Sequence, residues 1–487
     1  MNDNTKHKYC LIMLFLLSII FTFFITFSTI YAQQPQQQNE PQSIAGIILL
    51  DPNLKLQLVT SGLDFPTTMA FLGPEDFLIL EKSGTVKRVT DGQIVAKPLL
   101  HVDVNEKDER GLLGIAVSNK REKSNDTSIS KQEVSLKVFL YYITCEGKNA
   151  DCKNQIYRYD LDNKNNALIN PKLLLSIPSF PDPAHIGGII DIGPDNNLYF
   201  TIGNFQHTIP EEPYKTKTQN FEDGKAVDGR AGILRITQDG KPVESGILGN
   251  EYPLNLYYAY GVKNSFGLDF DPVTGKLWFT ENGPRYGDEI NLAEPGSNSG
   301  SDKIFGIWRV NEEGKKLEAG SSAKDEGEGE GAESEGDGEK GKDVGAGETK
   351  FVTVGNTPPK DFVYFEGRGH YSPPKFTWDK SSPPTGILFL NSDKLGSEYK
   401  NDMFVGSVDG RIFHFDLNDN RTELLLKGVL EDKIATDSTE YGDILFAEGF
   451  SIITDLKQGP DGYLYVVSGL KGSEAENPGA VYRIVPK

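Results

Sequence analysis

A turn followed by a short alternating strand recurs along this 487-residue chain. Each copy opens with Gly-Pro or Asp-Pro, continues through a polar spacer and ends in a strand that finishes near Gly or Asn. Proline presets the backbone for the first corner of a β-turn, and Asp or Gly completes the turn. The four clearest copies are GPEDFLILEKSG at 73–84, GPDNNLYFTIGN at 193–204, DPVTGKLWFTENG at 271–283 and GPDGYLYVVSG at 459–469.

Repetition on this scale predicts units that cannot bury their faces alone and therefore pack on their neighbours. Helical periodicity is scarce, whereas further strand-like runs, such as KVFLYYITC at 137–145, lie between the copies. With four strands per unit, the pattern predicts an all-β fold, a six-bladed β-propeller. The units are longer than the roughly 40–45 residues of a compact propeller repeat, so we expect long loops.

The N-terminal segment predicts export. Lys6 and Lys8 precede an apolar run at 11–32, which ends at Ala32 before the polar QQPQQQ. This pattern is typical of a signal peptide, and the run is also long enough to be an uncleaved membrane anchor. Both alternatives predict an extracytoplasmic protein, secreted or anchored to the outer face of the cytoplasmic membrane. Residues 33–45 would form a Gln/Pro-rich tether, followed by the propeller at 46–487.

The charge of the chain limits the classes of partner that it can bind, and one segment is rich in charged residues. The formal net charge is −20, which argues against nucleic acid because phosphate binding needs a clustered positive surface. Residues 312–350 hold 13 acidic and 6 basic residues with much glycine. Such a segment cannot bury enough apolar surface to offset its ordering entropy. It is therefore predicted to be a low-complexity insert in the propeller.

Two cysteines remain beyond the leader. Cys145 and Cys152 bracket a short polar loop. In an exported domain this spacing favours one local disulfide. A metal site is the alternative, although no nearby Cys or His completes one.

Four stretches of loop and strand carry a family resemblance. They read ERGLLGIA at 109–116, HIGGIIDIGPD at 185–195, YGVKNSFGLDF at 260–270 and ENGPRYGDEINL at 281–292. In order and approximate spacing they resemble the soluble pyrroloquinoline quinone (PQQ) dependent sugar dehydrogenases, the glucose/sorbosone dehydrogenase family. The resemblance runs from about residue 54 to 486 and is interrupted by the acidic insert.

The resemblance implies a quinoprotein oxidoreductase that oxidises an aldose and passes electrons to an external acceptor. PQQ is an ortho-quinone with three carboxylates, and in the family a Ca²⁺ ion polarises its carbonyl. A histidine takes the hydroxyl proton of the sugar while hydride moves to the quinone. The resemblance assigns residues of this chain to these roles as follows: the base to His185 with Asn204 as its partner, cofactor contacts to Glu109, Lys263 and Asn264, and metal ligands to Gly283, Pro284 and Glu289.

This chain departs from the family pattern at several of those places. Asn204 stands where the family has an Asp, and Lys263 stands where it has an Arg. Lysine keeps the charge but loses the fork geometry of arginine. A Lys and two Arg residues that hold the PQQ carboxylates in the family correspond here to Val408, Ile452 and Thr454. Arg285, Lys457 and Arg411 are candidates to replace those three cations, and the Tyr that completes a second Ca²⁺ site is Ser299.

Two further functions therefore stay open. The first is a cofactor-free propeller that binds a glycan or a protein partner at the cell surface, which the three lost cations favour. The charge of the pocket discriminates the two: converging basic side chains support the dehydrogenase, and a neutral or aromatic pocket supports binding. The second is a propeller hydrolase of lactones, with Asn204, Asn264 and Asn282 around a central Ca²⁺.

Overall fold

The structure is a computed structural model that describes residues 46–118, 136–146, 151–179, 184–205, 215–310, 352–354, 362–469 and 479–487. The chain divides into two units, 1–45 and Gly46–Lys487, and the described residues all belong to the second. The expected leader at 1–32, the tether at 33–45 and the acidic insert at 312–350 lie outside the described residues. Within the described ranges, no helix is long and apolar enough to cross a membrane.

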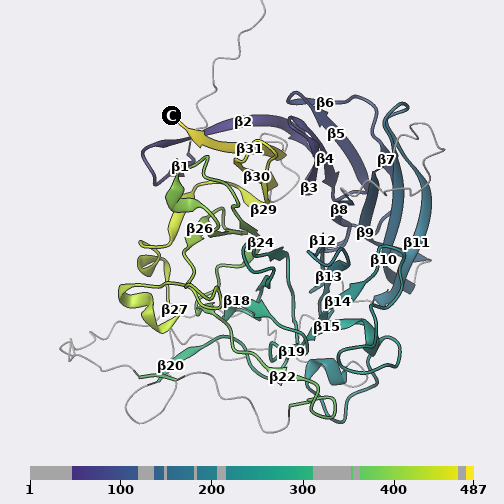
Figure 1. Ribbon diagram of the computed structural model, residues 1–487, viewed down its shortest axis with the longest axis vertical. Helices are drawn as coiled ribbons and strands as arrows, with labels where there is room; N and C mark the ends of the chain where they lie inside the picture. Colours follow the sequence, from purple (N-terminus) through teal and green to yellow (C-terminus); the bar gives the residue numbers. More distant parts are fainter. Residues whose placement is uncertain are drawn as a thin grey trace, which may run out of the picture. The chain divides into compact units, whose positions relative to one another are not determined.

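Strands dominate the described part of Gly46–Lys487, and its helical segments are short 3-10 turns. This part holds six sheets of four or more strands and one separate two-stranded sheet. Figure 1 shows the six sheets around a common centre, with β3, β8, β12, β24 and β29 nearest to it and β1 and β2 on the outside. The innermost strands contact one another in a closed cycle, in the order β3 (Pro66–Gly73), β8 (Leu112–Ser118), β12 (Gly187–Ile192), β16 (Gly267–Phe270), β24 (Pro384–Phe389), β29 (Ile452–Gln458) and β3 again. The expected all-β propeller is thus confirmed.

The first three sheets follow one another along the chain. Sheet I continues from β3 through β4 (Asp76–Glu81) and β5 (Thr85–Thr90), which pairs with both β6 (Gln93–Ile94) and β7 (Leu100–His101). Sheet II continues from β8 through β9 (Lys137–Glu146), β10 (Asp151–Asp162) and β11 (Ala167–Ser179). Sheet III continues from β12 through β13 (Leu198–Ile202), β14 (Gly232–Ile236) and β15 (Tyr257–Tyr260), with β19 (Ser297–Asn298) and β22 (His370–Tyr371) added in parallel.

Sheets IV and V also run outward from an innermost strand, and each ends in a short strand from another part of the chain. Sheet IV continues from β16 through β17 (Leu277–Glu281), β18 (Asp288–Ala293) and β23 (Phe376–Trp378) to the parallel strand β27 (Ile434–Ala435). Sheet V continues from β24 through β25 (Met403–Ser407), β26 (Ile412–Phe415) and β28 (Leu445–Glu448) to β1 (Ile48–Leu49). The separate pair is β20 (Trp308–Val310) with β21 (Val352–Val354), and the 3-10 turns are η1 (Lys217–Gln219), η2 (Leu254–Leu256), η3 (Ser397–Tyr399), η4 (Gly428–Asp432) and η5 (Ser438–Glu440).

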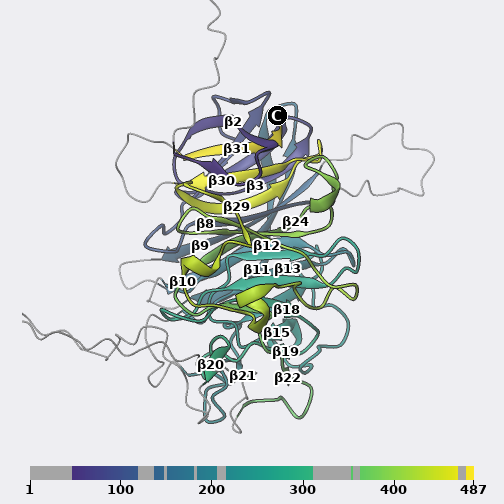
Figure 2. The same ribbon diagram turned by 90° about the vertical axis from the view of Figure 1, so that its left-hand side faces the viewer.

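Sheet VI is composite. It continues from β29 through β30 (Leu464–Gly469) and β31 (Gly479–Pro486) to β2 (Leu54–Leu63), which comes from the other end of the chain. Figure 2 shows β2 beside β31. Among the described residues, sheets I and II are each built from one stretch of chain; five blades are counted without the composite sheet VI, and six with it. The difference from the expected six arises because the closing sheet is shared by the two ends of the propeller.

The recurring proline turns all occupy the same place in a sheet. They join the first strand to the second in sheets I, III, IV and VI. In sheet III the turn residue Asp195 accepts a hydrogen bond from Tyr199 Oη (3.0 Å) and pairs with Arg235 of the third strand. Sheet VI repeats this arrangement with Asp461, Tyr465 and Arg483. The sequence repeat is thus a repeat of turn chemistry as well as of strand pattern.

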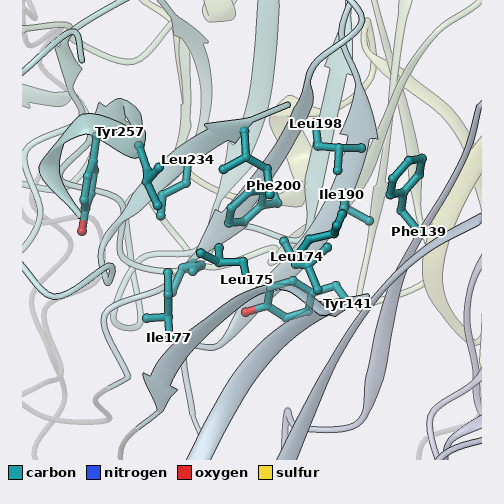
Figure 3. Packing of buried hydrophobic residues seen from close by; sticks show 14 of the residues in the cluster. Phe139, Tyr141, Leu174, Leu175, Ile177, Ile190, Leu198, Phe200, Leu234 and Tyr257 are labelled. Atoms are coloured by element: carbon teal, nitrogen blue, oxygen red, sulfur yellow. The ribbon is translucent and has the colours of Figure 1, made fainter. Parts of the chain in front are cut away.

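Sheets II and III pack through a shared apolar core, drawn in Figure 3. Alternate residues of a strand face this core because side chains of a strand alternate between its two faces; β11 contributes the adjacent Leu174 and Leu175, where its register with β10 shifts. Full burial of one such side chain stabilises the fold by about 1.5–3 kcal/mol. The labelled members of this core are Phe139, Tyr141, Leu174, Leu175, Ile177, Ile190, Leu198, Phe200, Leu234 and Tyr257.

The expected disulfide is confirmed. Cys145 at the end of β9 lies opposite Cys152 near the start of β10, and the two sulfur atoms are bonded. The bond ties the ends of two neighbouring strands, so it pins a local hairpin rather than joining distant parts of the propeller.

Candidate functional site

His185 lies immediately before the innermost strand of sheet III. Its φ of +52° is in the left-handed region, a conformation that costs a non-glycine residue about 1–3 kcal/mol and persists only when its surroundings impose it. Here the His185 carbonyl accepts a hydrogen bond from Phe205 N. Gly203 passes so close to that carbonyl that a side chain at 203 would collide with it. The position of His185 is therefore set by the backbone around it.

Both ring nitrogens of His185 have partners. Nδ1 lies 3.0 Å from Asn204 Oδ1, and Asn204 Nδ2 donates to Asp302 Oδ1 at 2.7 Å. An amide NH₂ group can only donate, so it faces the carboxyl group, and the amide oxygen faces the ring. His185 therefore donates from Nδ1–H, which leaves the Nε2 lone pair as an acceptor. This arrangement supplies the orientation that a general base needs.

Asp302 is a site residue that the sequence reasoning missed. It accepts hydrogen bonds from Asn204, Gln219 Nε2 (2.8 Å) and Ser301 Oγ (2.8 Å). Burial raises the pKa of Asp302, while these donors and Lys263 favour its carboxylate. The acidic group that the family places directly on the histidine is thus one residue farther away, reached through Asn204. No motif marks Asp302, because it lies 98 residues beyond Asn204 in the chain.

Lys263 occupies the other side of His185. Its Nζ lies 2.9 Å from His185 Nε2 and donates to the Gly283 carbonyl at 3.2 Å. Burial lowers the pKa of Lys263, and the acids Asp302 and Glu109 oppose that shift. The structure therefore brings three predicted site residues, His185, Lys263 and Gly283, into one contact chain.

Glu109 and Asn264 hold the backbone that follows His185. Glu109 Oε2 accepts from Ile186 N and from Asn264 Nδ2, both at 3.1 Å, and Asn264 Oδ1 accepts from Gly187 N at 3.1 Å. Burial raises the pKa of Glu109, an effect that these hydrogen bonds partly offset. Both residues thus position the His185 segment, whatever else they contact.

The residues predicted to bind metal do not share hydrogen-bond partners with one another. Gly283 N donates to Asp288 Oδ1 at 2.8 Å, and burial raises the pKa of Asp288 to about 6. Glu289 accepts instead from Asn291 Nδ2 at 2.8 Å and from Gly306 N, and burial raises its pKa to about 7. Pro284 is exposed. Among the described residues, one group of His, Asp, Glu or Cys side chains is spaced for a metal, Asp402 with His414 and Asp416, and it lies around β26 rather than here.

The three asparagines proposed for lactone hydrolysis do not share a centre in their hydrogen bonds. Asn204 joins His185 to Asp302, and Asn264 joins Glu109 to Gly187. Asn282 Oδ1 is buried and has no hydrogen-bond partner among the described residues. It is an acceptor next to Gly283 in the chain, suited to a donor such as a sugar hydroxyl.

A pocket of about 290 Å³, here called the axial pocket, opens beside this network. All six innermost strands contribute to it, through residues just before their start or among their first three. Glu109 and Gly187 belong to its wall, whereas His185 does not. The complete wall consists of Phe65, Thr67, Lys82, Asp108, Glu109, Leu113, Gly187, Gly188, Ile189, Phe266, Thr385, Val408, Ile452 and Thr454.

The wall contains the three positions where the family carries cations, occupied here by Val408, Ile452 and Thr454. None of the suggested replacements lines it. Lys457 pairs with Asp455 at 3.3 Å, Arg411 pairs with Asp409, and Arg285 is exposed. Lys82 is the one positively charged side chain in the described wall, and it stands with two acids, Asp108 and Glu109.

The closed ring of sheets and the histidine network beside its axial pocket define a propeller of the sugar dehydrogenase type. The chain belongs to the glucose/sorbosone dehydrogenase family, whose model matches residues 63–331. It is similar to the aldose sugar dehydrogenase YliI of Escherichia coli, with 23% identity over 89% of this chain and 93% of the relative. It is also similar to quinoprotein glucose dehydrogenase B of Acinetobacter calcoaceticus, with 25% identity over 88% of each.

Solved structures of sugar dehydrogenases have a similar fold. The PQQ-bound form of aldose sugar dehydrogenase from Streptomyces coelicolor superposes with a TM-score of 0.55 and 19% identity, over 90% of this chain and 98% of that one. At 19% identity this similarity shows that the two proteins share a fold, and nothing further. Members of the family thus hold PQQ on this scaffold, and whether this chain can do so depends on its own residues.

The residues of this chain do not fit PQQ held through its carboxylates. Three carboxylates removed from water need cationic or hydrogen-bonding partners, and the wall offers Lys82 against two acids. A Ca²⁺ ion at the Gly283 carbonyl would lie beside the Lys263 ammonium, which already donates to it, and like charges at that distance repel. We therefore assign no reaction step to PQQ or to Ca²⁺.

Proposed function

We propose that this protein is an oxidoreductase that oxidises an aldose sugar, with His185 as the base that accepts the hydroxyl proton. The observation that carries the proposal is the ring of His185, oriented at Nδ1 by Asn204 and Asp302 with Nε2 as the acceptor. Family membership supports a sugar as the substrate class.

The reaction removes one proton and one hydride from the sugar. The O–H proton of the anomeric hydroxyl passes to His185 Nε2, the C–H hydride leaves to an external electron acceptor, and the new C=O makes the sugar a lactone. General base catalysis of this kind contributes about 10²–10⁴-fold to a rate. Asn204 cannot stabilise the imidazolium by charge, so that role falls to Asp302 at the end of the hydrogen-bonded chain.

Lys263 gates the lone pair of the base. Its Nζ donates a hydrogen bond to Nε2 of His185, so an incoming sugar hydroxyl must replace Lys263 as the donor to Nε2. The displaced ammonium keeps Gly283 O as a partner, and it can donate to the sugar oxygen on which negative charge develops. Asn282 Oδ1, buried and unpartnered among the described residues, is a suitable acceptor for a neighbouring hydroxyl.

The test is reduction of a dye acceptor by the purified full-length chain with a panel of aldoses. We expect sugar-dependent reduction by the wild type and a loss of at least about 100-fold in His185→Ala. His101→Ala is the matched control, because His101 is exposed on β7 outside the site. Absence of reduction with every aldose, or full activity of His185→Ala, would reject the proposal.

We also propose that the protein acts outside the cytoplasm, held by or released from residues 11–32. The Cys145–Cys152 disulfide supports an oxidising compartment. N-terminal sequencing of the mature protein, together with fractionation, tests this: a start near residue 33 means cleavage, and an intact N-terminus in the membrane fraction means an anchor. Recovery in the cytoplasm with reduced cysteines would contradict it.

A second candidate function is a cofactor-free propeller that binds a glycan or a protein at the cell surface. The observation that favours it is the wall of the axial pocket, in which Val408, Ile452 and Thr454 replace cations. Glycan-array binding without sugar-dependent dye reduction would select this function, and it would leave His185→Ala with unchanged binding.

A further inference from the structure

The side chains around the axial pocket leave it almost without hydrogen-bond donors. Its three threonine hydroxyls all donate to backbone carbonyls: Thr67 to Leu112 O (2.9 Å), Thr385 to Ile453 O (2.7 Å) and Thr454 to Pro66 O (2.9 Å). Because a hydroxyl has one hydrogen, none of them is left to donate to a ligand.

Lys82 is the one ammonium in the described wall, and it is partly committed. Its Nζ donates to Glu106 O at 2.8 Å and lies 5.6 Å from the centre of the Phe65 ring. An ammonium has three hydrogens, so Lys82 can serve one acceptor oxygen of a ligand. Asp108 and Glu109 give the wall a negative charge balance.

The rest of the wall is apolar and in part aromatic. Six side chains, one from each sheet, make it so: Phe65, Leu113, Ile189, Phe266, Val408 and Ile452. Such a wall contacts a flat apolar ring well, but it leaves sugar hydroxyls and carboxylates without partners, which is costly once they leave water. The polar groups that suit a sugar lie instead around His185.

We propose that the axial pocket binds an uncharged quinone ring, without carboxylates, and that this quinone is the hydride acceptor of the reaction. The redox role rests on the proposed function, whereas the preference for an uncharged ring rests on the wall alone. One quinone carbonyl accepts a hydrogen bond from Lys82, and the ring packs on the six apolar side chains. Two electrons and one proton pass from the sugar as hydride to the quinone, and one proton passes to His185, so that a hydroquinone forms when that second proton is delivered.

A matched pair of ligands tests the preference. PQQ and its trimethyl ester share one ring system and differ in the three carboxylate charges. We expect the ester to bind the full-length wild type at least about tenfold more tightly than PQQ, because each unpaired buried carboxylate costs at least one tenfold step in affinity. Binding is measured by titration calorimetry without sugar.

Placing cations in the wall of the axial pocket should reverse the order of the two affinities. In the double variant Val408→Lys, Ile452→Arg we expect PQQ to bind more tightly than the ester. Val429→Lys, at a site that is 61% exposed in η4, adds charge elsewhere and should leave the wild-type order unchanged. Should the double variant not fold, Lys82→Met provides the second measurement: it should weaken the ester about tenfold, because the quinone carbonyl loses its donor, and weaken PQQ by more, because a carboxylate loses the one cation of the wall.

Two results would overturn the inference: PQQ binding the wild type as tightly as the ester, or no measurable binding of the ester. Failure of the proposed function looks different. There the ester would bind with the expected preference, yet no aldose would reduce it.

Discussion

A buried ion pair between sheets IV and V provides a sharp test of the fold's energetics. Asp271, in the turn after β16, is 1% exposed, and Arg421, beyond β26, is 9% exposed. Arg421 Nε donates to Asp271 Oδ1 at 2.7 Å, and its guanidinium lies 5.7 Å from the centre of the Phe389 ring. Arg421→Met keeps much of the apolar packing and leaves Asp271 as a buried charge without its cation. We expect the free energy of unfolding to fall by about 3–5 kcal/mol.

The measurement is urea unfolding of the wild type and the variant at one pH, followed by tryptophan fluorescence. Arg421→Met, Asp271→Asn should recover at least about 2 kcal/mol, because no unpaired charge remains. Lys172→Met is the control: Lys172 pairs with Asp239 at 3.5 Å on the surface, so its loss should cost less than about 1 kcal/mol. If Arg421→Met costs no more than Lys172→Met, the reasoning about desolvation at Asp271 is wrong.

Three further results are expected. Asp302→Asn should lower kcat for sugar oxidation about tenfold at constant KM, because Asn204 loses a charge-assisted acceptor; an unchanged kcat would remove Asp302 from the site. The pKa of Asp288 is raised by burial to about 6, so its contribution to stability is fully present below its unfolded pKa of about 3.9 and is lost as pH rises through 6, by about 3 kcal/mol in total. Thermal melts from pH 4 to 8 should therefore show a flatter decline in Asp288→Asn, and parallel curves would contradict this. Joint replacement of Cys145 and Cys152 by serine should cost about 2 kcal/mol in urea unfolding, the value for a short loop, and no effect would mean that the hairpin does not depend on its disulfide.

Local turn chemistry is the part of the fold that can be predicted from the sequence. Proline turns such as those at 193–195 and 459–461 specify where a first strand ends and a second begins, and the structure has strands at those places. The short parallel strands β19, β22 and β27 could not be predicted. Each has two residues and pairs with a strand distant in the chain, so it exists because the sheets bring it there.

The candidate site divides in the same way. The contact chain of His185, Asn204, Lys263 and Gly283 follows from motifs that lie in the connections between strands of the neighbouring sheets III and IV. Asp302 comes from a loop without a motif, and its role depends on a contact across 98 residues. The committed hydroxyls of the axial pocket were also beyond prediction, because no sequence pattern tells where a threonine hydrogen points.

Because sheet VI is composite, the ring of sheets can close only after β31 has been synthesised. β2 is among the first strands of the propeller to be made and β31 is the last, yet the two pair along almost their whole length. Until Gly479–Pro486 is synthesised, β2 lacks the strand with which it pairs, and unpaired edges invite pairing with other chains. A chain cut short by even its last eight residues would keep that edge open.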